Sequence, residues 1–385
     1  MNIIYIGAFP PNFLVERSKG KIDSLYRDDQ AIIRGLYCQD DVSLSVITSP
    51  DIASWPKGPF LVQRERDDVE GITIVSSLNV SLLKQPWTIV SMLREANRLI
   101  KRYDEKVIII VPYLVFRHVF VLRLLKWLHP RKVVQAIIVP DIFFPSNRLL
   151  KRVNRFTEQV TAKFDAFVLY TKKMAEHLQV KEGHYEVIEG FREVPEHKLL
   201  LNNDFKIVYA GSLNLNYGVG RLLDALSLID DTNVQLHLYG DGSAVPKIIE
   251  LSEKDNRLFY HGKVPNAEAV EAIYSASVLI NPRNAYDGEY TEYSFPSKDI
   301  EYMATGIPTL LCKLPGMPEQ YYNYFIDMGE GTPAQIATAI KRVMAMSIDE
   351  RNALGAEAKQ FIKDRMDCKK QGERIVALFN RVITN

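Results

Sequence analysis

The side chains best suited to chemistry gather after residue 280 of the chain. Arg283 follows an apolar run, and a short helix is predicted between Pro296, which suits a first helical turn, and Gly306, which suits a helix end. The opening turns of that helix carry a hydroxyl, an ammonium and a carboxylate, on Ser297, Lys298 and Glu301. A carboxylate accepts both hydroxyls of a ribose, and an ammonium holds a diphosphate. The pattern predicts a nucleotide site; the simpler alternative is a solvated helix pair of Lys298 with Glu301.

Glycine-containing turns follow three successive apolar runs in the second half of the chain. They carry Gly211 and Ser212, then Gly240 and Gly242, and then His261, Gly262 and Val264. Glycine lets backbone N–H groups approach a ligand closely, and the N-terminus of a following helix favours a phosphate. One such turn is usually no more than a turn, but three in succession at the same edge of one sheet favour a nucleotide site.

The elements that must position these turns are strands and helices in alternation, because short runs rich in Ile and Val alternate with helix-length segments. Runs that are apolar throughout suit strands buried on both faces, and hence parallel sheets covered by helices. Strands are predicted at Ile3–Ile6, Leu44–Ile47, Ile72–Val75, Val107–Val111, Val133–Val139, Ala166–Leu169, Tyr185–Ile188, Lys206–Tyr209, Val234–Tyr239, Leu258–Tyr260, Ser277–Ile280 and Thr309–Leu311. Helices are predicted at Arg27–Leu36, Thr88–Lys101, Phe116–Leu128, Arg148–Lys163, Pro333–Ala345, Ile348–Arg365 and Lys369–Arg381.

The length of 385 residues exceeds what one core usually supports, so we expect two α/β domains. The polar, proline-containing segment Phe191–Asp204 is the predicted linker, which places one domain at residues 1–193 and the other at 204–368. Two similar α/β domains in tandem usually bind a ligand in the cleft between them, beyond the carboxyl ends of their strands.

Composition and charge exclude several classes of protein. The chain holds 48 Lys and Arg against 47 Asp and Glu, a balance that argues against a nucleic-acid binder. Its three cysteines, far apart, form neither a disulfide framework nor a zinc pattern, so a reducing compartment fits. The start of the chain lacks the pattern of a signal peptide, and no run approaches the ~20 apolar residues of a transmembrane helix. We therefore expect a soluble intracellular protein.

The even total hides a basic stretch in the first half of the chain. Residues 84–173 hold 18 basic and 6 acidic side chains, and aromatic residues are interleaved with them, among them Trp87, Phe116, Phe120, Trp127, Phe143 and Phe144. A basic, aromatic-rich stretch can lie on an anionic membrane surface or receive an anionic ligand. The alternative is a pair of amphipathic helices whose apolar faces belong to the core and whose cations are solvated.

Several common site motifs are absent from the sequence. The turn after Ile3–Ile6 has one glycine and two prolines instead of G-x-G-x-x-G, and neither G-x-x-x-x-G-K-[ST] nor G-x-S-x-G occurs. The sequence therefore gives no support for a nicotinamide- or flavin-dependent enzyme, a P-loop phosphotransferase or a hydrolase with a nucleophile elbow. No D-x-D stands at a strand end and no His, Cys and Asp cluster has ligand spacing, so we expect no metal and no cofactor.

The runs GSLNLNYGVGRLLDAL, LHLYGDGS, FYHGKVP, INPR and YSFPSKDIEYMATGIPTLLCKLPGMPEQY together resemble the donor half of bacterial glycosyltransferases of family 4, in the polysaccharide-assembly branch with an SFPSK motif. The resemblance is strong over about 205–325; IVPD (138–141) and FVLYTKKM to YEVIEG (167–190) look like the acceptor half. It implies the GT-B fold, with two Rossmann-like domains. Residues 1–193, joined by a last helix at 369–385, are implied to bind the acceptor, and 204–368 the nucleotide sugar.

The resemblance also implies roles for single residues. Glu301 matches the ribose ligand, and His261, Gly262 and Val264 match the segment that contacts the base through its backbone. Asp141, at a strand end of the acceptor half, is the candidate for the acceptor hydroxyl; the alternative is an aspartate that caps its own loop. The family implies a retaining reaction without an essential metal, with a UDP- or GDP-linked donor as substrate.

The sequence departs from the family pattern at two places. Relatives have a glutamate eight positions before the one matched by Glu301, where this chain has Tyr293; Glu289 or Glu292 can substitute, and the sequence does not choose between them. Many relatives also hold the diphosphate with a basic pair after the first strand of the donor domain, where this chain has Ser212, Asn214 and Tyr217. Arg283 and Lys298 are then the available cations for the phosphates.

Taken together, these features predict a glycosyltransferase that moves a sugar from a nucleotide diphosphate to a growing glycan, with a glycan or polyprenyl-diphosphate-linked acceptor, in cell-surface polysaccharide synthesis. Arg283, Lys298 and Asp141 are the expected catalytic residues. We expect it in the cytoplasm, with peripheral contact to the inner face of the membrane. Two alternatives are a nucleotide-sugar epimerase of the same fold and a catalytically silent subunit that binds nucleotide or a partner, which Tyr293 keeps open.

Overall fold

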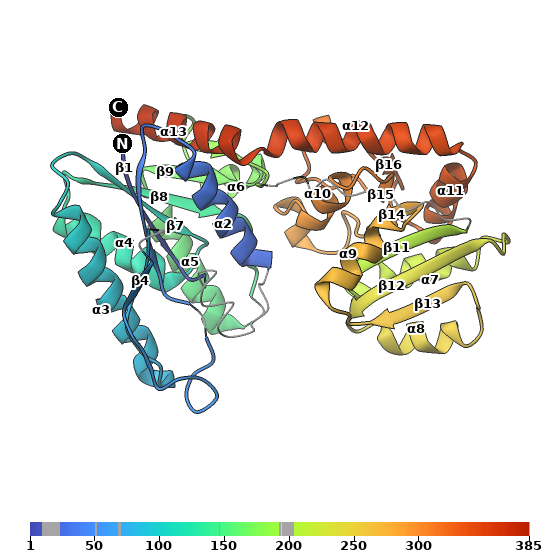
Figure 1. The fold of residues 1–385 in the computed structure, drawn as a ribbon, viewed down its shortest axis with the longest axis horizontal. Helices are drawn as coiled ribbons and strands as arrows, with labels where there is room; N and C mark the ends of the chain where they lie inside the picture. Colours follow the sequence, from blue (N-terminus) through green and yellow to red (C-terminus); the bar gives the residue numbers. More distant parts are fainter. Residues whose placement is uncertain are drawn as a thin grey trace. The chain divides into compact units, whose positions relative to one another are not determined.

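The computed structural model describes residues 1–9, 24–50, 52–67, 71–145, 147–191, 194 and 204–384. Within them the chain forms two compact units, Met1–Phe191 with Met366–Asn385, and Arg192–Arg365. Residues 10–23 and most of the predicted linker at 191–204 lie outside the described residues. Figure 1 shows both units as layers of helices around a sheet.

Unit 1 contains an eight-stranded sheet in the order β10-β9-β8-β7-β1-β2-β5-β4. Neighbouring strands are parallel except β4 and β5, which are antiparallel. The central strand β7 has the sequence VIIIVP and is buried along its whole length, as expected for a parallel strand covered on both faces. The strands are β1 (Asn2–Gly7), β2 (Ser43–Thr48), β4 (Glu65–Asp67), β5 (Ile72–Ile74), β7 (Val107–Pro112), β8 (Val133–Val139), β9 (Ala166–Leu169) and β10 (Tyr185–Val187), with a separate antiparallel pair β3 (Leu61–Val62) and β6 (Ser77–Leu78).

The helices of unit 1 are α2 (Ser24–Tyr37), α3 (Ser81–Ile100), α4 (Phe116–Leu128), α5 (Arg148–Thr161), α6 (Lys172–His177) and α13 (Cys368–Thr384). Helix α4 contacts both α3 and α5. Helix α3 begins at Ser81, almost two turns before the predicted start at Thr88, although it contains Pro86. The N–H that Pro86 lacks would have bonded the carbonyl of Leu82, which lies in an exposed first turn, so the proline costs the helix little there.

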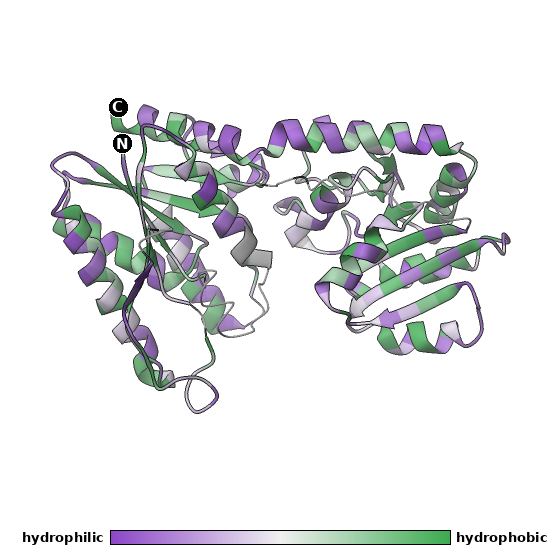
Figure 2. Ribbon diagram, viewed as in Figure 1, coloured by the Kyte–Doolittle hydropathy of each residue, from purple (hydrophilic) through white to green (hydrophobic). Residues whose placement is uncertain are grey.

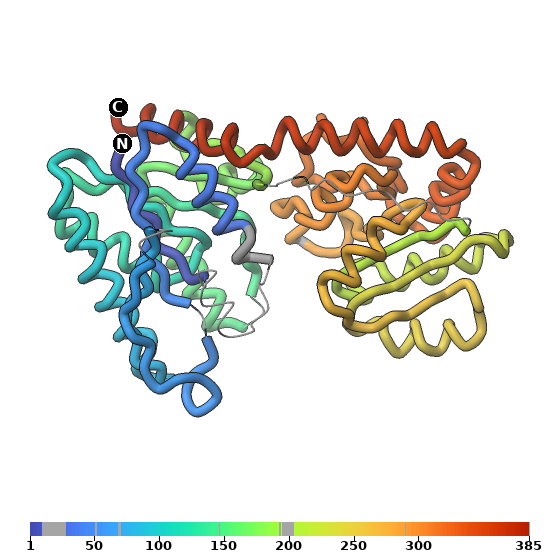
Figure 3. The backbone as a smooth tube through the Cα atoms, in the orientation of Figure 1, coloured from blue at the N-terminus to red at the C-terminus, as the bar shows by residue number. Residues whose placement is uncertain are grey.

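The C-terminal helix α13 packs on α2, and Figure 3 shows the red C-terminal segment beside the blue α2. Two glycines allow this contact: a Cβ on Gly35 would lie 2.5 Å from the carbonyl oxygen of Cys368, and a Cβ on Gly372 would overlap the carbonyl oxygen of Gly35. Arg374 and Arg381 then pair with the two carboxylate oxygens of Glu186 in β10, at 2.9 and 3.0 Å. The end of the chain is thus held to unit 1 by close helix packing and by a shared carboxylate.

Unit 2 contains a six-stranded parallel sheet in the order β13-β12-β11-β14-β15-β16. In chain order this is 3-2-1-4-5-6, the doubly wound arrangement of a Rossmann-like domain. The strands are β11 (Phe205–Ser212), β12 (Val234–Asp241), β13 (Leu258–Gly262), β14 (Val278–Ile280), β15 (Thr309–Leu311) and β16 (Ile326–Asp327). The helices are α7 (Val219–Leu226), α8 (Val245–Ser252), α9 (Asn266–Tyr274), α10 (Ser297–Met303), α11 (Pro333–Met344) and α12 (Ile348–Met366).

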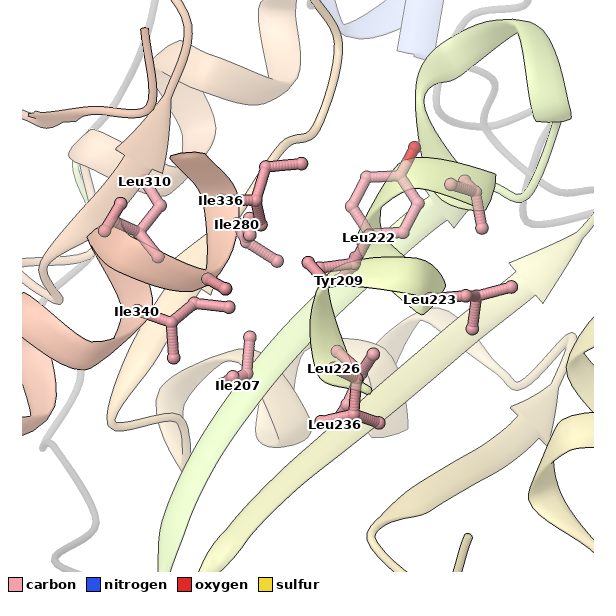
Figure 4. Close-up of a cluster of buried hydrophobic side chains, with 14 of the residues drawn as sticks. Ile207, Tyr209, Leu222, Leu223, Leu226, Leu236, Ile280, Leu310, Ile336 and Ile340 are labelled. Carbon is pink, nitrogen blue, oxygen red and sulfur yellow. The ribbon is translucent and has the colours of Figure 1, made fainter. Parts of the chain in front are cut away.

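The core of unit 2 lies between one face of this sheet and helices α7 and α11. Figure 4 shows aliphatic side chains of both helices, including Leu222, Leu226, Ile336 and Ile340, packed against residues of four strands, including Ile207. Figure 2 shows the corresponding hydrophobic colour along the strands. Among the described residues, no helix is both long enough and apolar enough to cross a membrane.

Candidate functional site

The candidate site lies where the strand order of unit 2 reverses, between β11 and β14. These two strands are hydrogen-bonded neighbours. From β11 the chain continues to β12 on one side within the sheet, whereas from β14 it continues to β15 on the other side. In open α/β sheets, ligands bind outside the carboxyl ends of the strands at this point. Strand β11 ends in Gly211 and Ser212, and β14 is followed directly by the segment that carries Arg283. The structure therefore brings together residues that are about seventy positions apart in the sequence.

Lys298 lies over the end of β11. A Cβ on Gly211 would lie 2.8 Å from Cε of Lys298, so the lysine stem runs directly over this glycine and would have to shift if the glycine carried a side chain. Helix α10 is fixed to the strand by Tyr302, whose hydroxyl accepts a hydrogen bond from the N–H of Ala210 at 2.8 Å. Lys298 Nζ lies 5.4 Å from the centre of the Tyr302 ring and 3.8 Å from a carboxylate oxygen of Glu301. The Lys298–Glu301 helix pair, which the sequence analysis gave as the simpler alternative to a nucleotide site, is therefore present at this edge of the sheet.

Arg283 is held by aromatic rings instead of by a carboxylate. Its guanidinium carbon lies 4.2 Å from the ring centre of Tyr217 and 5.4 Å from that of Tyr290, within the range of cation–π contacts. Its Nε is buried and has no hydrogen-bond partner among the described residues. A buried, unsatisfied donor is costly, so an acceptor on a ligand would be favoured at this position.

A second arginine builds the loop that carries Arg283. Arg221 in α7 donates to both carboxylate oxygens of Asp287, at 2.8 and 3.0 Å, and to the carbonyl of Pro282 at 3.0 Å. A bidentate arginine–carboxylate pair fixes geometry well. Because Asp287 is bonded to Arg221, the positive charge of Arg283 is left available to a ligand.

Asp299 is a buried acidic residue near both cations that the sequence analysis missed. One of its carboxylate oxygens accepts a hydrogen bond from Asn281, which follows β14, at 2.6 Å. Burial raises the pKa of Asp299 to about 6, against the opposing effects of Asn281, Arg283 and Lys298. Helix α10 is too short for its sequence to show which face is buried. The burial of Asp299, its third residue, could therefore be found only from the fold.

Gly240, near the end of β12, and Gly242, just after it, allow neighbouring turns to pack closely. Gly240 has φ +136°, and a Cβ there would overlap the carbonyl oxygen of Gly211. A Cβ on Gly242 would lie 2.5 Å from the carbonyl oxygen of Leu213, and the N–H of Gly242 donates to the side chain of Asp241 at 2.8 Å. These contacts account for both glycines without a ligand, although both lie at the predicted edge.

At the end of β13, His261 belongs to a row of stacked rings. It lies parallel to Tyr239 at 4.2 Å between ring centres, and its Nε2 lies 2.9 Å from Nδ1 of His237. Burial, and then the neighbouring His261, lower the pKa of His237 to about 4, so this ring is neutral at physiological pH. Gly262 has φ +69° at the turn that follows, and Val264 is half-buried. All three residues predicted to contact the base lie at the same sheet edge as Gly211.

The remaining predicted residues fall in three places. Ser297 is exposed at the start of α10. Glu292 is exposed and Tyr293 half-buried at the end of a short 3-10 turn, Glu289–Glu292; the Glu289 side chain lies outside the described ones, so the choice between the two glutamates stays a prediction. Asp141 follows β8 in unit 1, where it is exposed and accepts a hydrogen bond from the N–H of Ile142 at 2.9 Å. That contact fits a loop cap.

Within the described ranges, no group of three or more His, Cys, Asp or Glu side chains is arranged to hold a metal ion.

Comparison with known proteins agrees with this geometry. Residues 204–346, which carry all the candidate groups of unit 2, match the family model described as glycosyl transferases group 1. No curated protein sequence matches the chain.

Solved structures resemble the chain over its whole length. Anabaena Alr3699/HepE, solved in complex with UDP, has 14% identity and a TM-score of 0.65, covering 99% of this chain and 100% of its own. The sucrose-phosphate synthase tll1590 of Thermosynechococcus elongatus has 13% identity and a TM-score of 0.66, with 100% of both chains covered. OtsA in its apo form has 12% identity and a TM-score of 0.69, with 98% of both chains covered. The prediction of an α/β chain with the GT-B fold is confirmed.

Proposed function

We propose that the protein is a glycosyltransferase that takes a sugar from a nucleotide diphosphate. The observation that carries this proposal is the pair of cations, Arg283 and Lys298, at the strand-order reversal of a glycosyl transferases group 1 domain. A departing nucleoside diphosphate bears about two negative charges, and such charge is stabilised by cations that are already in position.

The two cations differ in how they are prepared for this role. Arg283 contacts the rings of Tyr217 and Tyr290 and keeps a buried donor unsatisfied, so its orientation is set before a ligand arrives. Lys298 is held over Gly211 and pairs with Glu301, whose carboxylate is 35% exposed and can reach the ribose hydroxyls in our proposal. Preorganised charge avoids reorganisation during the reaction, which is the main source of electrostatic catalysis.

The finer features of the proposal come from the resemblance of the sequence. We propose retention of the anomeric configuration, no essential metal, a lipid-linked glycan as acceptor with Asp141 near its hydroxyl, and a role in cell-surface polysaccharide synthesis. In retaining enzymes of this kind a diphosphate oxygen is the usual candidate to take the acceptor proton, which agrees with a site rich in cations. Because HepE was solved with UDP, UDP-sugars are the first donors to test.

The test is a panel of UDP- and GDP-sugars, incubated with the full chain with and without EDTA and with a lipid extract as acceptor. We expect release of nucleoside diphosphate from at least one donor, undiminished by EDTA, and a product with the donor's anomeric configuration by NMR. An epimerised sugar would indicate an epimerase. Nucleotide binding without any turnover would indicate a silent subunit, and complete loss in EDTA restored by Mg²⁺ or Mn²⁺ would contradict metal independence.

A further inference from the structure

Helix α5 in unit 1 presents its apolar side chains to solvent. Its exposed residues include Leu149 at 69%, Leu150 at 52% and Phe156 at 55%. The buried residues of the helix are Thr157 and Thr161, both polar. A surface helix of a globular protein normally buries its apolar stripe and exposes its polar one. In α5 this order is reversed.

The exposed stripe belongs to a well-formed helix. Asn147 caps the helix by accepting hydrogen bonds from the N–H groups of Leu149 at 2.8 Å and Leu150 at 3.3 Å. Further along, Asn154 donates to the carbonyl of Phe143 and to Glu158, at 2.9 and 2.8 Å. The cap and these anchors hold the first turns in place, so the stripe is a feature of the folded unit.

Basic side chains flank the stripe. Arg148, Lys151, Arg152 and Arg155 are all exposed, and none forms an ion pair with a residue that the structure describes. No acidic residue occurs between Asp141 and Glu158. We call residues 148–153, 155 and 156 the α5 surface, in which exposed basic and apolar side chains lie on the same helix.

Neighbouring elements extend this apolar character. Phe143, 64% exposed, and Phe144 precede α5 in the chain, and α4, which contacts α5, begins with the exposed, stacked rings of Phe116 and Phe120 at 6.0 Å. Helix α4 buries four apolar side chains, Val119, Val121, Leu122 and Leu125, and exposes four, Phe116, Phe120, Trp127 and Leu128. The alternative that the basic stretch 84–173 consists of ordinary core-facing helices therefore fits α4 in part and does not fit α5.

We propose that the α5 surface docks on an anionic lipid bilayer, with Leu149, Leu150, Val153 and Phe156 at the acyl boundary. The four cations would meet the headgroups, since basic side chains are attracted to anionic lipid and their long stems let the charge reach the interface. A second copy of this chain fits less well, because it would bring the same four cations to the same place. The inference goes beyond the proposed function, because it concerns unit 1 and needs no nucleotide.

The experiment measures sedimentation of the full chain with vesicles of phosphatidylcholine alone and of phosphatidylcholine mixed with phosphatidylglycerol, without any donor. We expect binding to the mixed vesicles only, lost as salt rises from about 0.1 M to about 1 M, because the Debye length falls from about 10 Å to about 3 Å. The double variants Leu150→Ser with Phe156→Ser, and Arg148→Gln with Arg152→Gln, should each weaken binding about tenfold or more.

The matched control variants make the same kinds of substitution, apolar to Ser and basic to Gln, at exposed residues of unit 2. Leu228→Ser with Ile249→Ser alters two side chains that are each 46% exposed, and Lys254→Gln with Arg342→Gln removes two exposed cations. Both should bind like the wild type. Equal binding to both vesicles, binding to neither, or loss in the controls as large as in the α5 variants would overturn the proposal. So would self-association of the wild type that the α5 variants abolish. None of these results depends on sugar transfer, so failure here is separate from failure of the proposed function.

Discussion

In our proposal, three side chains at the sheet edge of β11 and β14 hold different parts of the donor. Arg283 and Lys298 carry positive charge, while Glu301 is the carboxylate beside Lys298. The proposed roles differ, because a cation near the diphosphate acts on charge that develops during bond cleavage, whereas a ribose ligand acts equally on bound donor and transition state. Mutations should separate these roles in the kinetics.

Glu301→Gln should raise the donor KM while leaving kcat close to the wild-type value. The amide keeps the shape of the side chain but weakens the acceptance of two ribose hydroxyls, a loss of uniform binding. We expect a rise in KM of about tenfold, corresponding to about 1.4 kcal/mol. Initial rates against donor concentration would show this. A fall in kcat with unchanged KM would place Glu301 in the chemical step instead.

Asp299 should make stability depend on pH. Its pKa is raised from 3.8 to about 6 by burial, so between these values the folded chain holds a proton that the unfolded chain has lost. Stability is then greatest below pH 4 and falls as pH rises through 6, by about 3 kcal/mol for a shift of this size. Asp299→Asn keeps an amide partner for Asn281 and removes this titration.

Denaturant unfolding of the wild type and of Asp299→Asn at several pH values between 4 and 7 would measure the effect. We expect the stability advantage of the variant over the wild type to grow steadily with pH. An advantage that stays constant across this range would show that the Asp299 carboxyl is not desolvated in the folded chain. The buried Asp29, whose pKa is likewise raised to about 7, is present in both proteins. Its contribution to the pH dependence therefore cancels when the wild type and Asp299→Asn are compared.

Among the elements, α13 depends on a close backbone contact that one methyl group should disrupt. A Cβ on Gly372 would overlap the carbonyl oxygen of Gly35 in α2, so Gly372→Ala should destabilise unit 1 by about 1–3 kcal/mol, as overpacking does. Gly220→Ala is the matched control, because it lies in α7 with its nearest neighbour, a leucine methyl, at 3.4 Å. That change should be neutral or stabilising by up to about 1 kcal/mol. Thermal unfolding would compare them, and equal Tm values for both would contradict the packing.

The elements also show what the sequence could reveal. Long aliphatic runs such as Val107–Val111 predicted the bounds of their strands to within one or two residues. Burial on both faces of the sheet makes the whole strand apolar, which is easy to recognise in a sequence. Two-residue strands such as β3 and β6 were missed, since they have no period to detect. The ring contacts of Arg283 with Tyr217 and Tyr290 were missed for another reason: these residues meet only when β11 and β14 become neighbours.

At the scale of the whole chain, charge is divided between the two units in a way that matches their proposed tasks. The basic excess of residues 84–173 is partly structural: Lys126 bonds the carbonyl of Val133 at 2.7 Å, and Arg123 bonds Gln135 at 3.1 Å. The cations of the α5 surface have no such partners among the described residues. In unit 2, Arg283 and Lys298 lie at the edge of the sheet that β11 and β14 form. Sequence composition detected the excess, but only the fold separates these three uses of positive charge.

The most direct measurement is donor turnover by Arg283→Ala and Lys298→Ala, with Arg342→Ala as the control, since Arg342 is an exposed cation of α11. Each site variant loses one fixed charge at the diphosphate, so kcat/KM should fall about ten- to a thousandfold, the scale for one charge-stabilising contact. All three variants should keep the wild-type Tm, because neither site residue is a core packing residue. Near wild-type turnover and donor affinity in both site variants would contradict the assignment of the diphosphate to the edge of β11 and β14.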